Sequence, residues 1–292
     1  MRNDKDTKLK KGVSVNARRS IAYVVLVIVS FLCLFWFYVL FINATRTHAE
    51  LTKGFTPVPG SSLWTNWKNL SAGRAASALP IWYGLFNSFF ISTLSAALCT
   101  YFSTMTAYAI HAYEFKLKKF MFTFILMIMM IPTQVTALGF LQLVGKMKLD
   151  DSFIPLIVPS IAAPITFFYM KQYMESSLPL SLIEAARIDG SGEFRTFNSI
   201  VLPLMKPAIA VQAIFTFVSS WNNYFTPALI LHTDKKKTLP ILIAQLRSTD
   251  WLKFDMGQVY VMIVFSILPI ILIYMFLSKY IVQGVAMGSV KG

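Results

Sequence analysis

The side chains that most often do chemistry are few in this chain and far apart. The three histidines are His48, His111 and His232, and the two cysteines, Cys33 and Cys99, both lie inside apolar runs. A zinc or catalytic site needs several such groups brought together, and each histidine lies near the end of a different apolar run. We expect interfacial histidines, no metal site, no catalytic residue and no disulfide framework, which argues against an enzyme.

A nucleotide-binding phosphate loop is also missing from the sequence. The pattern GxxxxGK[ST] surrounds phosphates with backbone N–H groups and places a lysine against them. The nearest approach, from Gly139 to Gly145 and Lys146, has five intervening residues instead of four and no Ser or Thr after the lysine. We therefore expect no ATPase site in this chain, so energy from ATP would come from another protein.

One polar segment, residues 175–207, is strongly patterned. The run from Ser181 to Glu184 resembles a capping box, in which the two side chains satisfy each other's backbone N–H groups. A short helix is expected to continue to about Asp189. Gly190 then supplies the left-handed residue that commonly ends a helix.

A second helix is expected after this turn. It runs through Phe194 and Phe197 to Ile200, and Pro203 and Pro207 end it. The pattern predicts a compact helix–turn–helix, which is more structured than an ordinary connecting loop.

The elements around this segment are apolar enough for a membrane. Hydrophobic residues make up 56% of the 292 residues and charged residues only 14%, and the mean hydropathy is +0.60. A soluble domain has about a quarter charged residues. The net charge of +14 is not a nucleic-acid signal, because the basic residues cluster at the ends of apolar runs.

Six stretches are long enough to cross a bilayer, which takes roughly 20 residues in a helix. The sequence thus predicts an all-α integral membrane protein with six transmembrane helices. The spans are Ile21–Ile42, about 85–110 (following a turn at Pro80), Phe120–Gly145, Ser152–Met170, Pro207–Leu231 and Met256–Ser278.

Charge sets the expected orientation. Seven basic residues precede the first span and place the N-terminus in the cytoplasm. The first apolar run is longer than a signal-peptide core of roughly 7–15 residues, so an uncleaved anchor is expected. The expected regions are a cytoplasmic N-terminus (1–20), the anchor (21–42), an extracytoplasmic loop (43–82), a five-helix core (83–281) and a cytoplasmic tail (282–292).

The polar segment carries a known signature. Glu184-Ala185-Ala186, three residues, Gly190, nine residues, Ile200, one residue and Leu202-Pro203 match the EAA motif of bacterial ABC importer permeases at every fixed position. From the first span onward the chain resembles the six-helix partner of the maltose-type carbohydrate permeases. Further matches are Asn87-Ser88, the run Trp221–Phe225 with Pro227, and the glycine-rich ending; Asn223 departs from them, because an aspartate is common there.

The resemblance implies a type I ABC importer permease with the MetI-like fold. The EAA helix would fit into a cleft on an ATPase subunit and transmit its closure by rigid-body movement. Ala185 and Ala186 would allow close approach, and Glu184 would cap the helix and pair with a basic residue of the ATPase. The implied ATPase-coupling residues are Glu184, Ala185, Ala186, Asp189, Gly190, Leu202 and Pro203.

The implied partners are a homologous second permease, an ABC ATPase dimer, an extracytoplasmic solute-binding lipoprotein and membrane lipid, with no nucleic acid. No cofactor is expected in this chain, since ATP and magnesium would be bound by the ATPase subunits. The expected location is the bacterial cytoplasmic membrane, crossed several times, with both termini inside. The tail, ending in Lys291 and Gly292, would reach the ATPase or else be a frayed end.

Amide side chains are candidates for the translocation path: Gln134, Gln212, Asn222, Asn223 and Gln258. The alternative is that such amides join helices by hydrogen bonds. The resemblance places most sugar contacts in the other permease, so no sugar-binding residue is predicted here. The remaining alternatives are an importer of another solute, such as glycerol phosphate or a sugar acid, and a secondary carrier, which the lack of charges inside the spans disfavours.

Overall fold

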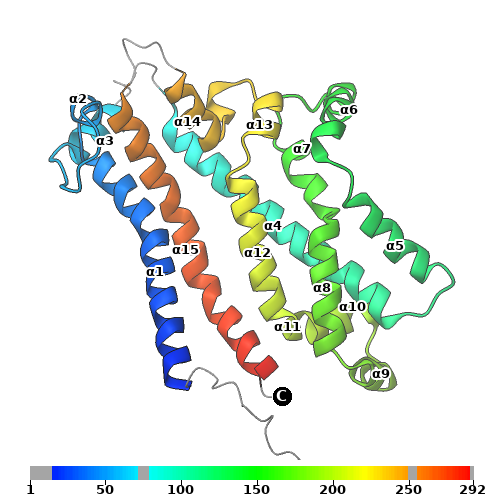
Figure 1. Cartoon of the computed structure of the whole chain (residues 1–292). Helices are drawn as coiled ribbons and strands as arrows, with labels where there is room; N and C mark the ends of the chain where they lie inside the picture. Colours follow the sequence, from blue (N-terminus) through cyan, green and yellow to red (C-terminus); the bar gives the residue numbers. More distant parts are fainter. Residues whose placement is uncertain (1–14, 72–78, 249–254, 290–292) are drawn as a thin grey trace, which may run out of the picture. The chain divides into compact units, whose positions relative to one another are not determined.

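The computed structural model describes residues 15–71, 79–248 and 255–289, with the side chains of all but residues 15–18, 133 and 281–289. Within these ranges every regular element is a helix (Figure 1). Three are not α-helices: η1 (Val158–Ile161) and η3 (Asp234–Lys236) are 3₁₀-helices and η2 (Phe197–Val201) is a π-helix. The α-helices are α1 (Val15–Ala44), α2 (His48–Leu51), α3 (Leu63–Ser71), α4 (Ile81–Ala112), α5 (Lys118–Ile128), α6 (Thr133–Lys146), α7 (Ile154–Ile157), α8 (Pro164–Ser177), α9 (Leu180–Ile188), α10 (Glu193–Thr196), α11 (Leu202–Leu204), α12 (Lys206–Trp221), α13 (Phe225–Ile230), α14 (Leu239–Arg247) and α15 (Met256–Ser289).

The described part of the chain contains four helices that are long and apolar enough to cross a membrane. They are Arg19–Ala44, Ile81–Ala112, Ile154–Ser177 and Met256–Tyr280. A fifth arises if the bent pair Glu193–Leu204 and Lys206–Trp221 forms one span. The chain is an all-α integral membrane protein, and these helices overlap five of the six predicted spans.

The predicted span Phe120–Gly145 is not a single helix. α5 ends at Ile128 and α6 begins at Thr133, with Pro132 in the N-cap position. Proline has no N–H to donate and disfavours the helical conformation in the residue before it. The predicted span Pro207–Leu231 is likewise divided, because α12 ends at Trp221 and α13 follows after a turn.

The chain separates into two compact units, residues 1–67 with 255–264 and residues 68–254 with 265–292. In the first unit, Asn66 anchors the segment that follows α1. Its buried amide donates to the carbonyl oxygens of Ala44 (3.1 Å) and Arg46 (2.9 Å). Gly257 lies against the same place, since a Cβ there would be 2.7 Å from the Arg46 carbonyl oxygen. The close approach explains why this residue is a glycine.

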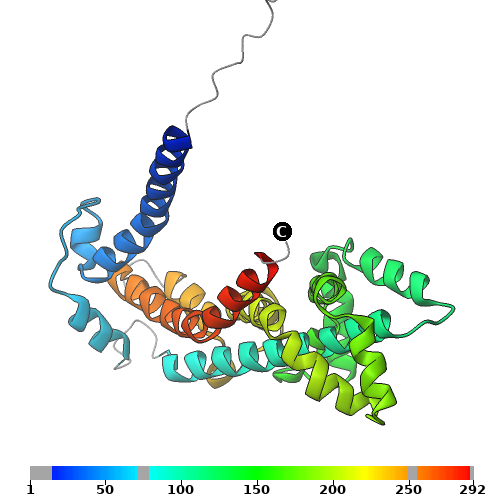
Figure 2. The same ribbon diagram turned by 90° about the horizontal axis from the view of Figure 1, so that it is seen from below.

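In the second unit, α4 is the central helix and packs against α8 and α12 (Figure 1, Figure 2). Its buried face is made mainly of small residues, which let neighbouring helices approach closely. The hydroxyls of Thr100 and Thr104 donate hydrogen bonds to carbonyl oxygens of α4 itself, at 2.8 and 2.6 Å. The small buried residues are Gly84, Ser88, Ser92, Ser95, Ala96, Cys99, Thr100, Ser103, Thr104 and Ala107.

Asn87 and Ser88, near the start of α4, hold the loop between α13 and α14. The Asn87 amide donates to the carbonyl oxygens of Lys235 (2.9 Å) and Lys237 (3.0 Å). The Ser88 hydroxyl accepts the Leu239 N–H at 2.8 Å. α4 therefore positions a loop about 150 residues further along the chain.

Candidate functional site

The helix that carries the Glu-Ala-Ala triplet begins two residues earlier than predicted. α9 starts at Leu180, with Pro179 as its N-cap and no side-chain cap. Ser181 thus lies within the first turn, where its hydroxyl is not in the capping position. The predicted capping box between Ser181 and Glu184 is wrong, because proline at the N-cap shifts the start of the helix.

The end of α9 is as predicted. Gly190 has a φ of +77°, the left-handed region that glycine enters without strain. Its N–H donates to the carbonyl of Arg187 (3.0 Å), and the Ser191 N–H donates to that of Ala186 (2.9 Å). These two bonds form a Schellman motif, which satisfies carbonyls that the helix end would leave free.

α9 has one buried and one exposed face. Ile183 belongs to the core cluster, and Ala186 is only 6% exposed. Glu184, Ala185 and Asp189 are exposed. Ala185 therefore leaves room for another molecule, whereas Ala186 is packed inside this chain. The coupling role expected of the two alanines stays a prediction.

The exposed face also carries large apolar side chains. Ile188 is 86% exposed, and Phe194, across the turn on α10, is 72% exposed. Together with the exposed triplet residues they form what we call the hairpin surface, made of Glu184, Ala185, Ile188, Asp189 and Phe194.

The second half of the segment contains a π-helical turn. In η2 the Leu202 N–H reaches back five residues to the Phe197 carbonyl. Pro203 follows directly, and its ring would collide with the Ser199 carbonyl in a regular α-helix. The wider π turn accommodates the proline. Around Met205 the chain then bends by 80° into α12, so the predicted break before that helix is confirmed. The helix continues through Pro203 to Leu204, however, and does not end at Ile200 as predicted.

A polar cluster ties this segment to α4. The Arg187 guanidinium contacts the Glu193 carboxylate at 2.7 Å and lies over the Tyr113 ring at 5.1 Å. The Tyr108 hydroxyl donates to the other oxygen of Glu193 at 2.8 Å. Next to it, a ring nitrogen of His111 lies 3.0 Å from the Leu178 carbonyl oxygen. Sequence reasoning missed this cluster, because Tyr108 and Glu193 are 85 residues apart.

The described residues contain no group of three or more His, Cys, Asp or Glu side chains that could hold a metal ion. His48 accepts the Met256 N–H at 3.2 Å, within the first unit. Cys99 contacts the hydroxyls of Thr166 and Thr216.

Residues 102–287 match the family described as binding-protein-dependent transport system inner membrane component. This range contains the whole polar segment 175–207, which we call the hairpin, and spans well over half of the chain. The chain belongs to this family.

Among its relatives, this family member is 34% identical over 268 residues to the arabinooligosaccharides transport system permease protein AraQ of Halalkalibacterium halodurans, covering 90% of this chain and 93% of that protein. It is 30% identical over 264 residues to the sn-glycerol-3-phosphate transport system permease protein UgpE of Yersinia pestis, covering 90% and 94%. A solved bacterial ABC transporter involved in import of the acidic polysaccharide alginate is similar in fold, with a TM-score of 0.75 and 21% identity over 92% of this chain and 99% of that one.

The predicted path residues of this transport component differ in their exposure. Gln134 and Asn222 are exposed, whereas Gln212 and Gln258 are buried, and the Gln258 amide donates to the nearby Asp255 carboxylate at 3.0 Å. Asn223 is half-buried and lines a cavity between α6, α7 and α13. In the coupling set, Leu202 is half-buried and Pro203 exposed. Lys291 and Gly292 lie outside the described residues.

Proposed function

We propose that this chain is a permease subunit of an ATP-driven, binding-protein-dependent sugar importer, in which it forms half of the translocation pore. The observation that supports this most strongly is the family match over residues 102–287 together with the exposed hairpin surface. The name of the AraQ relative supports an oligosaccharide as the substrate. A homologous permease would supply the other half of the pore.

The hairpin surface is the proposed contact with the ATPase. An exposed isoleucine and phenylalanine beside an acidic residue suit a cleft with an apolar floor and a basic rim. The polar cluster around Glu193 would make the hairpin and α4 move together when the ATPase dimer closes. Gly190, Leu202 and Pro203 shape the hairpin and need not touch the partner.

The proposed topology places the N-terminus, the hairpin and the C-terminal tail in the cytoplasm of a bacterial cell. The first loop and the loop between α13 and α15 would then face the extracytoplasmic binding protein. ATP and magnesium would be bound by the ATPase subunits, and this chain would supply no cofactor site. The basic cluster before the first span supports this orientation.

A second candidate function is import of glycerol phosphate. The UgpE relative favours it, at 30% identity over most of both chains. The two functions share all partners and differ only in the solute, so uptake competition between neutral oligosaccharides and sn-glycerol 3-phosphate separates them.

The first experiment is purification of the chain from its native membrane in mild detergent, with mass spectrometry of the subunits that copurify. We expect an ATPase with a phosphate-binding loop, a second permease and a binding lipoprotein. Recovery of the chain alone, with transport intact in liposomes that lack ATP, would contradict the importer and favour a secondary carrier.

A further inference from the structure

A cavity of about 250 Å³ lies in the second unit, between α6, α7 and α13. These three helices lie near one another in Figure 1, close to the loop that α4 holds through Asn87. The volume is below the roughly 300–1,000 Å³ of pockets that enclose drug-sized ligands. It suits a single ring of a larger molecule.

The chemistry of the lining is that of a sugar site. Asn223 brings a carboxamide, which can both donate to and accept from hydroxyl groups, and Thr136 and Thr226 bring hydroxyls. Phe140 and Phe225 bring aromatic rings. The negative face of such a ring attracts the polarised C–H groups on the flat side of a pyranose or furanose.

The lining also indicates the charge of the ligand. None of the eleven described residues that line the cavity is charged. A phosphate or carboxylate in such a place would lose hydration without gaining an arginine or lysine partner. The cavity therefore favours a neutral ring over an acidic one.

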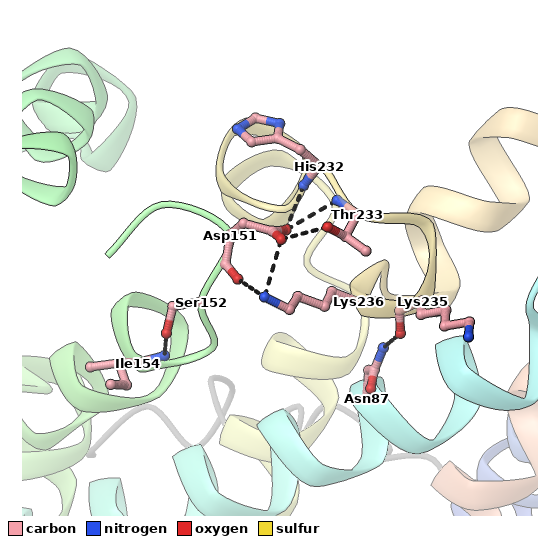
Figure 3. Close-up of polar contacts among 8 residues, drawn as sticks. All are labelled: Asn87, Asp151, Ser152, Ile154, His232, Thr233, Lys235 and Lys236. Atoms are coloured by element: carbon pink, nitrogen blue, oxygen red, sulfur yellow. Dashed lines mark hydrogen bonds and ion pairs between the residues drawn. The ribbon is translucent and has the colours of Figure 1, made fainter. Parts of the chain in front are cut away.

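One carboxylate joins the segments that form the walls of the cavity. Asp151 lies between α6 and α7, and its side chain accepts the N–H groups of His232 (2.9 Å) and Thr233 (3.1 Å) and the Thr233 hydroxyl (2.7 Å), just beyond α13 (Figure 3). Lys236 pairs with the same carboxylate at 3.1 Å. In addition, the Asp151 N–H donates to the Ile230 carbonyl at 3.0 Å. We call this set of contacts the Asp151 latch.

We propose that the cavity binds one ring of a neutral sugar, with Asn223 as the main polar contact and the Asp151 latch as its frame. The proposal rests on the proposed importer function and narrows its substrate class. It also assigns sugar contacts to this chain, where the resemblance to maltose-type permeases led us to expect them chiefly in the other permease.

The test is protection of an introduced cysteine in the complete transporter, in lipid nanodiscs. Two variants are made in a background that carries Cys33→Ser and Cys99→Ser. Thr226→Cys places the thiol in the cavity wall, and Asn222→Cys places it at an exposed position outside the lining. The labelling rate with a charged thiol reagent is measured in the presence of arabinotriose, maltotriose, lactose or sn-glycerol 3-phosphate. We expect at least one neutral sugar to slow labelling of Thr226→Cys saturably, by about threefold at twice its dissociation constant. Labelling of Asn222→Cys should not change, nor should glycerol phosphate protect either position.

Adding Asn223→Leu should abolish the protection while leaving the unprotected labelling rate of Thr226→Cys the same. Lack of protection by every neutral sugar, equal slowing at both cysteines, or protection by glycerol phosphate overturns the proposal. If the unmodified complex imports a neutral sugar in proteoliposomes but no neutral sugar protects Thr226→Cys, the cavity assignment fails and the importer function stands. If the complex imports only glycerol phosphate, the sugar function itself fails.

Discussion

The hydroxyl of Tyr108, on α4, donates a hydrogen bond of 2.8 Å to Oε2 of Glu193, at the start of α10. Through this contact α4 holds the hairpin near its C-terminal end, while Asn87 near its other end holds the loop before α14. One helix thus contacts both the hairpin and the loop before α14. A rigid connection of this kind transmits a displacement without absorbing it.

Tyr108→Phe should loosen the hairpin without unfolding the protein. It removes a hydrogen bond to a charged group, worth about 1.5 kcal/mol, and leaves the ring contact with Phe197 in place. We expect fewer sugar molecules imported per ATP hydrolysed in proteoliposomes, with ATPase copurification unchanged. The control is Tyr101→Phe, on the same helix α4, which removes a neutral hydrogen bond from Tyr101 to Asn198. An equal loss of coupling in both variants would contradict the role assigned to Glu193.

Gly190 should tolerate asparagine but not valine. A Cβ at this position meets nothing within 4 Å, so the cost of substitution is the strain of a φ of +77°, about 1 kcal/mol or more for valine. Asparagine enters this region more readily. Uptake should fall with Gly190→Val and largely persist with Gly190→Asn. The matched control is Gly192→Ser, at a position with open space and a negative φ. If Gly192→Ser lowered uptake as much as Gly190→Val, backbone strain would not be the cause.

Ile188→Ser should weaken ATPase binding and leave the fold intact. The side chain is 86% exposed, so its loss removes no internal packing. Ile183→Ser, on the buried face of the same helix, should instead lower the melting temperature. ATPase copurification and thermal unfolding in detergent distinguish the two effects. Full ATPase recovery with Ile188→Ser would argue against the hairpin surface as the docking site.

Asn87→Ala should destabilise the second unit. It removes two hydrogen bonds to the carbonyls of Lys235 and Lys237, worth together about 2 kcal/mol. A lower melting temperature is expected, along with faster tryptic cleavage at the lysines of this loop. Asn222→Ala, at an exposed amide, should change neither. A stable loop in Asn87→Ala would show that other contacts suffice to hold it.

The Asp151 latch should be insensitive to pH near neutrality. Hydrogen bonds from the Thr233 hydroxyl and from the N–H groups of His232 and Thr233 hold the pKa of the Asp151 carboxyl well below its usual range. For a carboxyl whose pKa is lowered on folding, the stabilisation is complete above the ordinary value of about 4 and is lost as the pH falls through the folded value. The difference in melting temperature between the unmodified protein and Asp151→Asn should therefore be constant from pH 8 to pH 5. A gap that closes between pH 7 and pH 5 would contradict the latch.

Some features could be predicted from the sequence because they depend on local composition or geometry. Uninterrupted apolar runs predicted the membrane helices α1, α4 and α15 and the helical stretch Ile154–Ser177, since lipid demands internally hydrogen-bonded backbone over a fixed length. The spacing from Glu184 to Pro203 led to the family, which the match over residues 102–287 confirms. The left-handed turn at Gly190 was predictable because glycine alone enters it without strain.

Only the tertiary structure decided how distant segments meet. The long stretch without charged residues was predicted as one span that joined α5 and α6 across Pro132, although a single proline is enough to separate them. The inward position of Ala186 depends on which face of α9 meets the core. The contact of Tyr108 with Glu193 and the Asp151 latch each join residues about 80 positions apart. Such contacts arise from the packing of whole helices, for which no short stretch of sequence carries a signal.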